Sequence, residues 1–204
     1  MSWDFKNDNK GDSKKLEFTK FPEGITRVRV VGLEPHIRWN HWLNALKKGI
    51  NCAGKGCAIC EVRNRQKENN EIPSYNMARR FSIWVINRET GKLEVLEQGV
   101  TFFEDLRDIM EELADDGKTL RDVDLKIRRK GEKTNTTYRI SVDTESPLSE
   151  SDEKLMEEMF DLSEYFRPST LEQAMAIVNG ATWEEVMEMG KNNDDNEDKD
   201  IELK

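Results

Sequence analysis

The sequence has few cysteines and histidines, and it lacks any long apolar run. Its 204 residues include three Cys and two His, and a chain of this length can bury a core without disulfide staples. No apolar segment approaches the roughly 20 residues that a membrane-spanning helix needs. The first residues also lack the apolar stretch of a signal peptide. We therefore expect a protein of the reducing cytoplasm that does not contact a membrane.

Basic residues are also in the minority, but their distribution is uneven. The chain has 32 Lys and Arg against 41 Asp and Glu, a net charge of −9. Residues 1–140 hold 27 of the basic and 22 of the acidic residues, whereas residues 141–204 hold 5 and 19. This asymmetry favours a body that binds a polyanion, followed by an acidic tail. Solvated acidic helices would give a similar count, so charge alone does not decide.

Periodicity predicts a mainly β body followed by helices. Apolar and polar side chains alternate at residues 25–31, 80–86, 92–96, 123–129 and 136–142, as in half-buried strands. The aromatic-rich stretch 38–46 is expected to be extended, and residues 101–115 have helical spacing. After Pro147 the pattern predicts helices at residues 149–166, 169–179 and 182–189.

Five or so strands with one helix among them favour an α+β, mainly β fold, and the commonest small barrel of that shape is the oligonucleotide-binding (OB) barrel. Strand count alone does not separate such a barrel from a sandwich. We expect a flexible arm at residues 1–20 and the barrel at 21–145, with a separate subdomain within it at about 36–75. C-terminal helices should occupy residues 146–190. Residues 191–204 have little apolar content, which predicts a disordered acidic tail.

The three cysteines lie within nine residues, in the segment Cys52-Ala-Gly-Lys-Gly-Cys57-Ala-Ile-Cys60. The pair Cys57 and Cys60 has the spacing of a zinc knuckle. Gly54 and Gly56 would let the backbone fold back so that Cys52 reaches the same ion. A disulfide with one spare thiol fits a cytosolic chain poorly, and a polar, glycine-rich segment is a poor place for buried core thiols.

A fourth ligand would complete the tetrahedron, and the chain offers His36 and His41 for it. Three thiolates and one imidazole would leave no position for a catalytic water. The sequence therefore predicts one structural Zn²⁺, which stabilises a loop and takes no part in chemistry.

Aromatic and basic side chains recur along the strands. Bases stack on aromatic rings with little regard to sequence, while Lys and Arg follow the phosphates. A single Trp is more often a core residue, but cations that repeat at one strand parity favour a nucleic-acid surface. The candidate contacts are Arg27, Arg29, Arg38, Trp39, Trp42, Arg80, Trp84, Lys126, Arg128, Lys130 and Arg139.

The order of these features resembles a known family. A basic-apolar strand at residues 25–31 precedes Trp39-Asn-His-Trp42, then the cysteine cluster, a second basic strand pair at 128–138 and an acidic end. This arrangement is similar to the single-stranded-DNA-binding proteins of tailed phages, typified by the T-even phage replication protein, over roughly residues 16–145 and the tail.

The resemblance implies an OB barrel with an inserted zinc subdomain, and sequence-independent binding of single strands in replication, recombination and repair in the host cytoplasm. It also implies that His41 is the fourth zinc ligand. The family's basic N-terminal segment is only faintly matched by Lys14 and Lys15. The acidic end could compete with DNA or dock on replication or recombination proteins, with Asp198, Asp200, Ile201 and Leu203 as the candidate contacts; the alternative is a solubilising tail.

Two rival functions remain at this stage. A zinc-dependent nuclease would need an open metal position or clustered carboxylates, and a closed three-cysteine site argues against it. A regulator that reads duplex DNA would need a basic recognition helix near the cluster, where Arg63, Arg65 and Lys67 could serve. That interpretation leaves the repeated strand cations unexplained, so we expect a non-enzymatic protein that binds single strands.

Overall fold

The computed structural model describes residues 16–132 and 135–197, and within these it is a mixed α+β structure dominated by antiparallel strands. A seven-stranded sheet has the order β3-β2-β4-β1-β6-β7, and β5 pairs with β4 beside this path. The strands are β1 (Gly24–Val30), β2 (His36–Leu43), β3 (Lys48–Asn51), β4 (Tyr75–Asn87), β5 (Lys92–Gln98), β6 (Val123–Lys130) and β7 (Thr137–Glu145). The helices are α1 (Ala58–Glu68), α2 (Val100–Asp115), α3 (Glu150–Met156), α4 (Leu162–Tyr165), α5 (Leu171–Val178) and α6 (Trp183–Glu197).

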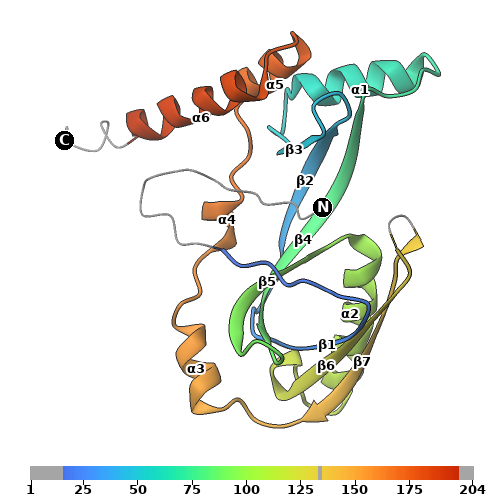
Figure 1. Cartoon of the computed structure of the whole chain (residues 1–204), viewed down its shortest axis with the longest axis vertical. Helices are drawn as coiled ribbons and strands as arrows, with labels where there is room; N and C mark the ends of the chain where they lie inside the picture. The colour runs from blue at the N-terminus through green and yellow to red at the C-terminus, as the bar shows by residue number, and fades with distance from the viewer. Residues whose placement is uncertain (1–15, 133–134, 198–204) are drawn as a thin grey trace.

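The strands β1, β5, β6 and β7 and the second half of β4 curve around one core, in the lower part of Figure 1. Their inward-facing side chains form a cluster that includes Val28, Val30, Ile83 and Leu125. The amphipathic helix α2 adds Phe102, Phe103, Leu106 and Leu113 to this cluster. The arrangement is consistent with an OB-like fold, in which a small sheet curls into a barrel.

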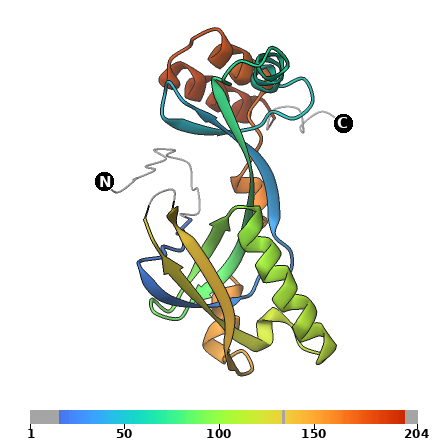
Figure 2. The same cartoon turned by 90° about the vertical axis from the view of Figure 1, so that its right-hand side faces the viewer.

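The long strand β4 continues out of the barrel and pairs with β2 along its first half. Around this extension lie β3, α1, α5 and α6, and Figures 1 and 2 show them as a second body above the barrel. Leu43 and Ile50 from the strands pack there with Ile59 of α1 and with Ala174 and Ile177 of α5. This second body, which we call the upper lobe, is therefore built from two chain segments about 100 residues apart.

The C-terminal segment covers the outer face of β4 and β5. Val31, Trp84, Ile86 and Val95 form a third cluster with Leu162 and Phe166, and Leu16 packs against it from the N-terminal side. Residues 149–166 were predicted as one helix, and this is wrong: α3 ends at Met156 and α4 starts only at Leu162. The break lets the chain turn so that Phe160 and Leu162 reach the sheet.

Most other predicted elements are found close to their expected bounds, but α6 continues to Glu197, so residues 191–197, predicted as part of a disordered tail, are helical. β1, β4, β5, α2, β6 and β7 correspond to the predicted strands and the predicted helix. The periodicity did not reveal β3 or α1, because β3 has only four residues and α1 has a polar sequence with Ala58 and Ile59 as its buried residues. Among the described residues, no helix is long and apolar enough to span a membrane.

Candidate metal centre and nucleic-acid interface

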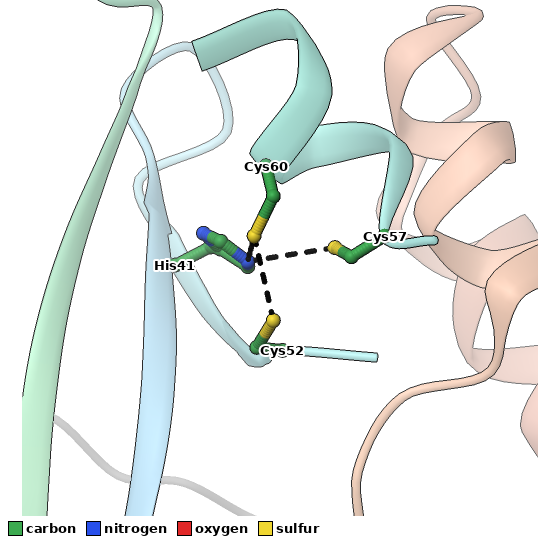
Figure 3. A group of neighbouring side chains, drawn as sticks. All are labelled: His41, Cys52, Cys57 and Cys60. Carbon is green, nitrogen blue, oxygen red and sulfur yellow. Dashed lines mark hydrogen bonds between the residues drawn. The ribbon is translucent and has the colours of Figure 1, made fainter. Parts of the chain in front are cut away.

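The upper lobe brings His41, Cys52, Cys57 and Cys60 together (Figure 3). His41 lies on β2 and is fully buried, and Cys52 directly follows β3. Cys57 is the residue before the first turn of α1, and Cys60 lies within that turn. The β2–β3 pair and the start of α1 thus supply all four groups.

The separations of the four ligand atoms match a tetrahedral metal site. Nε2 of His41 lies 3.6 Å from Sγ of Cys57 and 3.5 Å from Sγ of Cys60, and the Sγ atoms of Cys52 and Cys60 are 3.6 Å apart. All four atoms lie within 4.8 Å of one another. A zinc tetrahedron has edges of about 3.5 Å between nitrogen and sulfur and about 3.8 Å between two sulfurs. The three separations close to these edges, and the common limit of 4.8 Å, show that the four groups could hold one metal ion.

The two glycines of the cysteine loop adopt the conformation that their role requires. Gly54 has φ of +81° and Gly56 has φ of +82°, in the left-handed region that other residues rarely enter. The backbone N–H of Gly54 approaches Sγ of Cys52 at 3.4 Å, and the N–H of Cys57 donates to the carbonyl of Gly54. The prediction that these glycines turn the chain back toward Cys52 is confirmed.

Burial and mutual proximity shift the pKa values of His41, Cys57 and Cys60 in this cluster. Burial and the adjacent thiols of Cys52 and Cys57 raise the pKa of Cys60 to about 12. Burial acts in the same direction on Cys57, but backbone N–H groups, first that of Cys60, bring the pKa of Cys57 below its ordinary value. Burial also lowers the pKa of His41 and so keeps the imidazole neutral. A cation bound between the sulfur atoms would stabilise their thiolate forms, and a neutral imidazole can act as a ligand to it.

The geometry decides between the two histidines. His36 and His41 are five residues apart on β2, so their side chains point to opposite faces of the strand. His36 stacks on the ring of Phe166, with the ring centres 5.7 Å apart, and lies outside the cluster. Strand parity, applied to the sequence, would have separated the two.

An exposed aromatic residue lies between the barrel and the upper lobe. Trp39 of β2 is 47% exposed and pairs across the strands with Arg79 of β4, which is also exposed. Ile37, two residues along the same face, is 45% exposed. The guanidinium of Arg79 lies 5.0 Å from the ring centre of Phe81. The sequence singled out Trp39 but missed Arg79 and Ile37, which share its face because of the β2–β4 register.

The predicted cations of β1, β6 and β7 do lie on one outer face. Arg27 pairs with Lys126, and Arg128 pairs with Arg139. Arg27 and Lys126 both bind Asp143, at 2.7 Å and 2.5 Å, and Lys126 and Arg27 hold the pKa of that carboxyl below its ordinary value. Arg128 and Arg139 are exposed, as is Lys130 at the end of β6. We call Arg128, Lys130 and Arg139 the basic edge.

Two predicted contacts are buried, which corrects the prediction. The side chain of Arg29 is 0% exposed; it binds Asp124 at 2.7 Å and donates to backbone carbonyls of Arg121 and Ser146. Trp84 is 9% exposed, and its Nε1 donates to the carbonyl of Phe160. Both side chains do point to the outer face, as strand alternation predicts, but the C-terminal segment covers that face.

Arg38 is a third correction, because its side chain is only 10% exposed and has partners on every side. It pairs with Glu97 of β5 and donates to the hydroxyl of Ser82 and the amide oxygen of Asn51. Its guanidinium also lies 3.6 Å from the ring centre of Phe166. Each of its three nitrogens donates to a partner within the protein, so Arg38 is chiefly a structural residue.

The remaining predicted contacts are mixed. Trp42 and Arg80 are half-buried, on the face of the β2–β4 pair opposite to Trp39. The predicted tail contacts Asp198, Asp200, Ile201 and Leu203 lie outside the described residues, as does most of the predicted N-terminal arm.

Comparison with known proteins gives one significant similarity. The chain is 30% identical over 147 residues to a protein of Escherichia phage T5 named "Probable ssDNA-binding protein". The match covers 63% of this chain and 55% of the phage T5 protein, so the chain spans about half the length of this relative. No protein-family model matches the sequence, and no solved structure matches it significantly. The resemblance to phage single-stranded-DNA-binding proteins is thereby confirmed.

Proposed function

We propose that this protein binds single-stranded DNA without regard to sequence and has no enzymatic activity. The observation that carries the proposal is the pairing of Trp39 with Arg79 on an exposed strand face, where a base can stack on the indole while the guanidinium meets a phosphate. The printed name of the phage T5 relative supports the same function.

Arg128, Lys130 and Arg139 would bind phosphates on the outer face of the sheet. Trp39 and Arg79 lie on the other face, which continues the side of Phe81 and Ile83 where β2 and β4 leave the barrel, so a strand bound to both groups would pass around the sheet. Half-buried Trp42 and Arg80, on the same face as the basic edge, would contribute less. We infer that the barrel is an OB fold, with β2, β3 and α1 of the upper lobe inserted between its first two strands.

We propose that the ion held by His41, Cys52, Cys57 and Cys60 is a single Zn²⁺. Thiolate and imidazole donors in a tetrahedron are the set that zinc prefers. Four protein ligands leave no position for a water, so the ion would fix the β3–α1 loop and perform no hydrolysis. This closed site argues against a nuclease.

A titration with oligo-dT tests the function. We expect oligo-dT to bind more tightly than duplex DNA of equal length. The affinity for oligo-dT should fall steeply with salt: for each tenfold rise in salt concentration, log K should drop by about 0.7 per phosphate that the protein neutralises. Arg139→Ala should weaken all sequences alike and reduce that slope by about one contact. Arg107→Ala, on the acidic face of α2, is the matched control and should change neither. Tighter binding of duplex, or a preferred sequence, would favour the regulator; metal-dependent cleavage would favour the nuclease.

We further propose that the protein protects single strands in replication, recombination and repair within the cytoplasm of a phage-infected host. The acidic end of the chain, with Asp198, Asp200, Ile201 and Leu203, would dock on proteins of those processes. Both proposals rest on the resemblance and on the charge of the last residues.

A further inference from the structure

A groove of about 320 Å³ lies between α2 and the strand β4, on the side of the barrel along which α2 runs in Figure 2. Its floor is formed by Phe81 and Ile83 of β4 and by Phe103 and Leu106 of α2. The remaining lining residues are Leu33, Pro35, Arg79, Val100, Glu104, Arg107, Met110 and Leu120.

Several apolar side chains at this groove are left in contact with solvent. Leu33, in the connection from β1 to β2, is 81% exposed. Val100 and Met110, near the two ends of the groove wall on α2, are 42% and 44% exposed. Exposed apolar side chains are individually ordinary, but several around one hollow mark a binding surface.

The rim that α2 gives to this groove is acidic. Glu104 lines the groove, and Asp108 and Glu111 are exposed on the following turns of α2, beyond the lining residues. Arg107 is the cation on this stretch, and it lies 3.5 Å from both Asp108 and Glu111, which offset its charge. The carboxylates disfavour phosphates on the α2 side, while Arg79 lines the β4 side of the groove.

We propose that this groove binds a basic amphipathic helix of a partner protein. Such a helix places apolar side chains at positions i, i+3, i+4 and i+7 into a groove, where they would contact Leu33, Val100 and Met110. Its Lys and Arg side chains would pair with the carboxylates of α2. The sixteen residues of α2 span about 24 Å, enough to pack against roughly four turns of such a helix. Arg79 lines the groove and is also a proposed DNA contact, so the two sites adjoin. The peptide proposal is therefore tested at residues of α2, which are separate from Trp39 and the basic edge.

Two synthetic peptides test the proposal with the full-length protein. The first is a labelled 14-residue peptide of Leu and Lys with leucines on one helical face, and the second has the same composition in scrambled order. Fluorescence anisotropy should show binding of the first at least about tenfold tighter than of the second. Equal binding of the two peptides would overturn the proposal, because attraction by net charge alone would then explain it.

Variants locate the binding. Met110→Asp and Glu104→Lys should each weaken the patterned peptide about tenfold, the first by placing a charge in the groove and the second by reversing a rim charge. Ile72→Asp, at a residue 92% exposed outside the groove, is the control and should have no effect. Glu104 is exposed on a helix, so Glu104→Lys also keeps the test valid if Met110→Asp is poorly folded. Unchanged peptide binding by both variants in their folded state would overturn the proposal. A loss of oligo-dT binding as large as the loss of peptide binding would also overturn it, because the groove would then be part of the DNA-binding surface.

Discussion

The guanidinium of Arg38 lies 3.6 Å from the centre of the Phe166 ring, and this contact joins segments 128 residues apart in the chain. Arg38 lies on β2, which leads into the upper lobe, and Phe166 follows α4 on the outer face of the barrel. The amide of Asn51 donates to the carbonyl of Arg167, and the hydroxyl of Ser169 donates to the carbonyl of Asn51. The chain from Phe166 to Ser169 therefore fastens the upper lobe to the barrel.

Arg38→Ala should lower the free energy of unfolding by about 3 kcal/mol, because it leaves Glu97 without its partner in a poorly solvated place. Urea unfolding followed by circular dichroism measures this. The affinity of the folded variant for oligo-dT should stay unchanged. Arg128→Ala, in contrast, should reduce affinity and leave stability within about 0.5 kcal/mol. The opposite pattern would return Arg38 to the DNA surface.

Trp39→Ala should reduce DNA binding, whereas Trp84→Ala should reduce stability. Trp84 is packed against Phe160 and Leu162, so its truncation should cost about 3–5 kcal/mol of stability. Trp39 is half-exposed, and its truncation should instead weaken oligo-dT binding by about 1–3 kcal/mol with little change in the salt slope. The quenching of tryptophan fluorescence by oligo-dT should largely disappear in Trp39→Ala. Full quenching in that variant would show that the bases stack elsewhere.

The protein should contain one zinc ion per chain, and His41→Ala should lose it while His36→Ala retains it. Elemental analysis of natively purified protein measures the content. Because Cys57 and Ile59 pack with Ala174 and Ile177, metal loss should also loosen α5 and raise protease cleavage near residues 166–171. A His36→Ala variant that loses its zinc, or a wild-type protein without zinc, would contradict the assigned ligand set.

Stability should fall in acid partly through Asp152. Burial opposes ionisation of this residue, but hydrogen bonds from Arg88 and from the backbone of Ser149 hold the pKa of its carboxyl below the ordinary value. A lowered pKa in the folded state stabilises the protein above the unfolded pKa of about 3.9, and the contribution disappears as the pH falls through the folded value. Asp152→Asn should cost about 1–2 kcal/mol at pH 7. In urea titrations, the difference in free energy of unfolding between wild type and Asp152→Asn should shrink between pH 4 and pH 2. A constant difference would show that Asp152 does not contribute to the loss of stability in acid.

Local features of the chain were predictable where one segment supplies all the information. Gly54 and Gly56 and the spacing of Cys57 and Cys60 are local, and so the cysteine loop could be anticipated as a metal loop. The alternation along β1 and β4 placed Val28, Ile83 and Val85 toward one core, where they lie. The choice of His41 over His36 rested on resemblance, because alternation along β2 separates the two side chains but does not say which of them faces the cysteines.

Whether a side chain on the outer face of the sheet is exposed to solvent depends on segments that lie far away in the sequence. Arg29 and Trp84 point to the outer face of the sheet, as their parity requires, and that face would be open in an isolated barrel. At Trp84 it is covered by Leu162 and Phe166, and the carbonyl of Phe160 accepts from the indole. The guanidinium of Arg29 is enclosed by Asp124 and by the carbonyls of Arg121 and Ser146. Strand parity fixes the side to which a residue points, but not what packs against that side.

The sequence by itself determined the period of each strand, the amphipathic side of α2 and the composition of the cysteine loop, because these follow from spacings within one segment. Only the tertiary structure decided that α5 and α6 join the upper lobe, that Trp39 meets Arg79 and that Arg38 is enclosed by Glu97 and Phe166. Those outcomes depend on strand register and on long-range apolar burial, which arise from the whole chain folding together and leave no periodic pattern in any one segment.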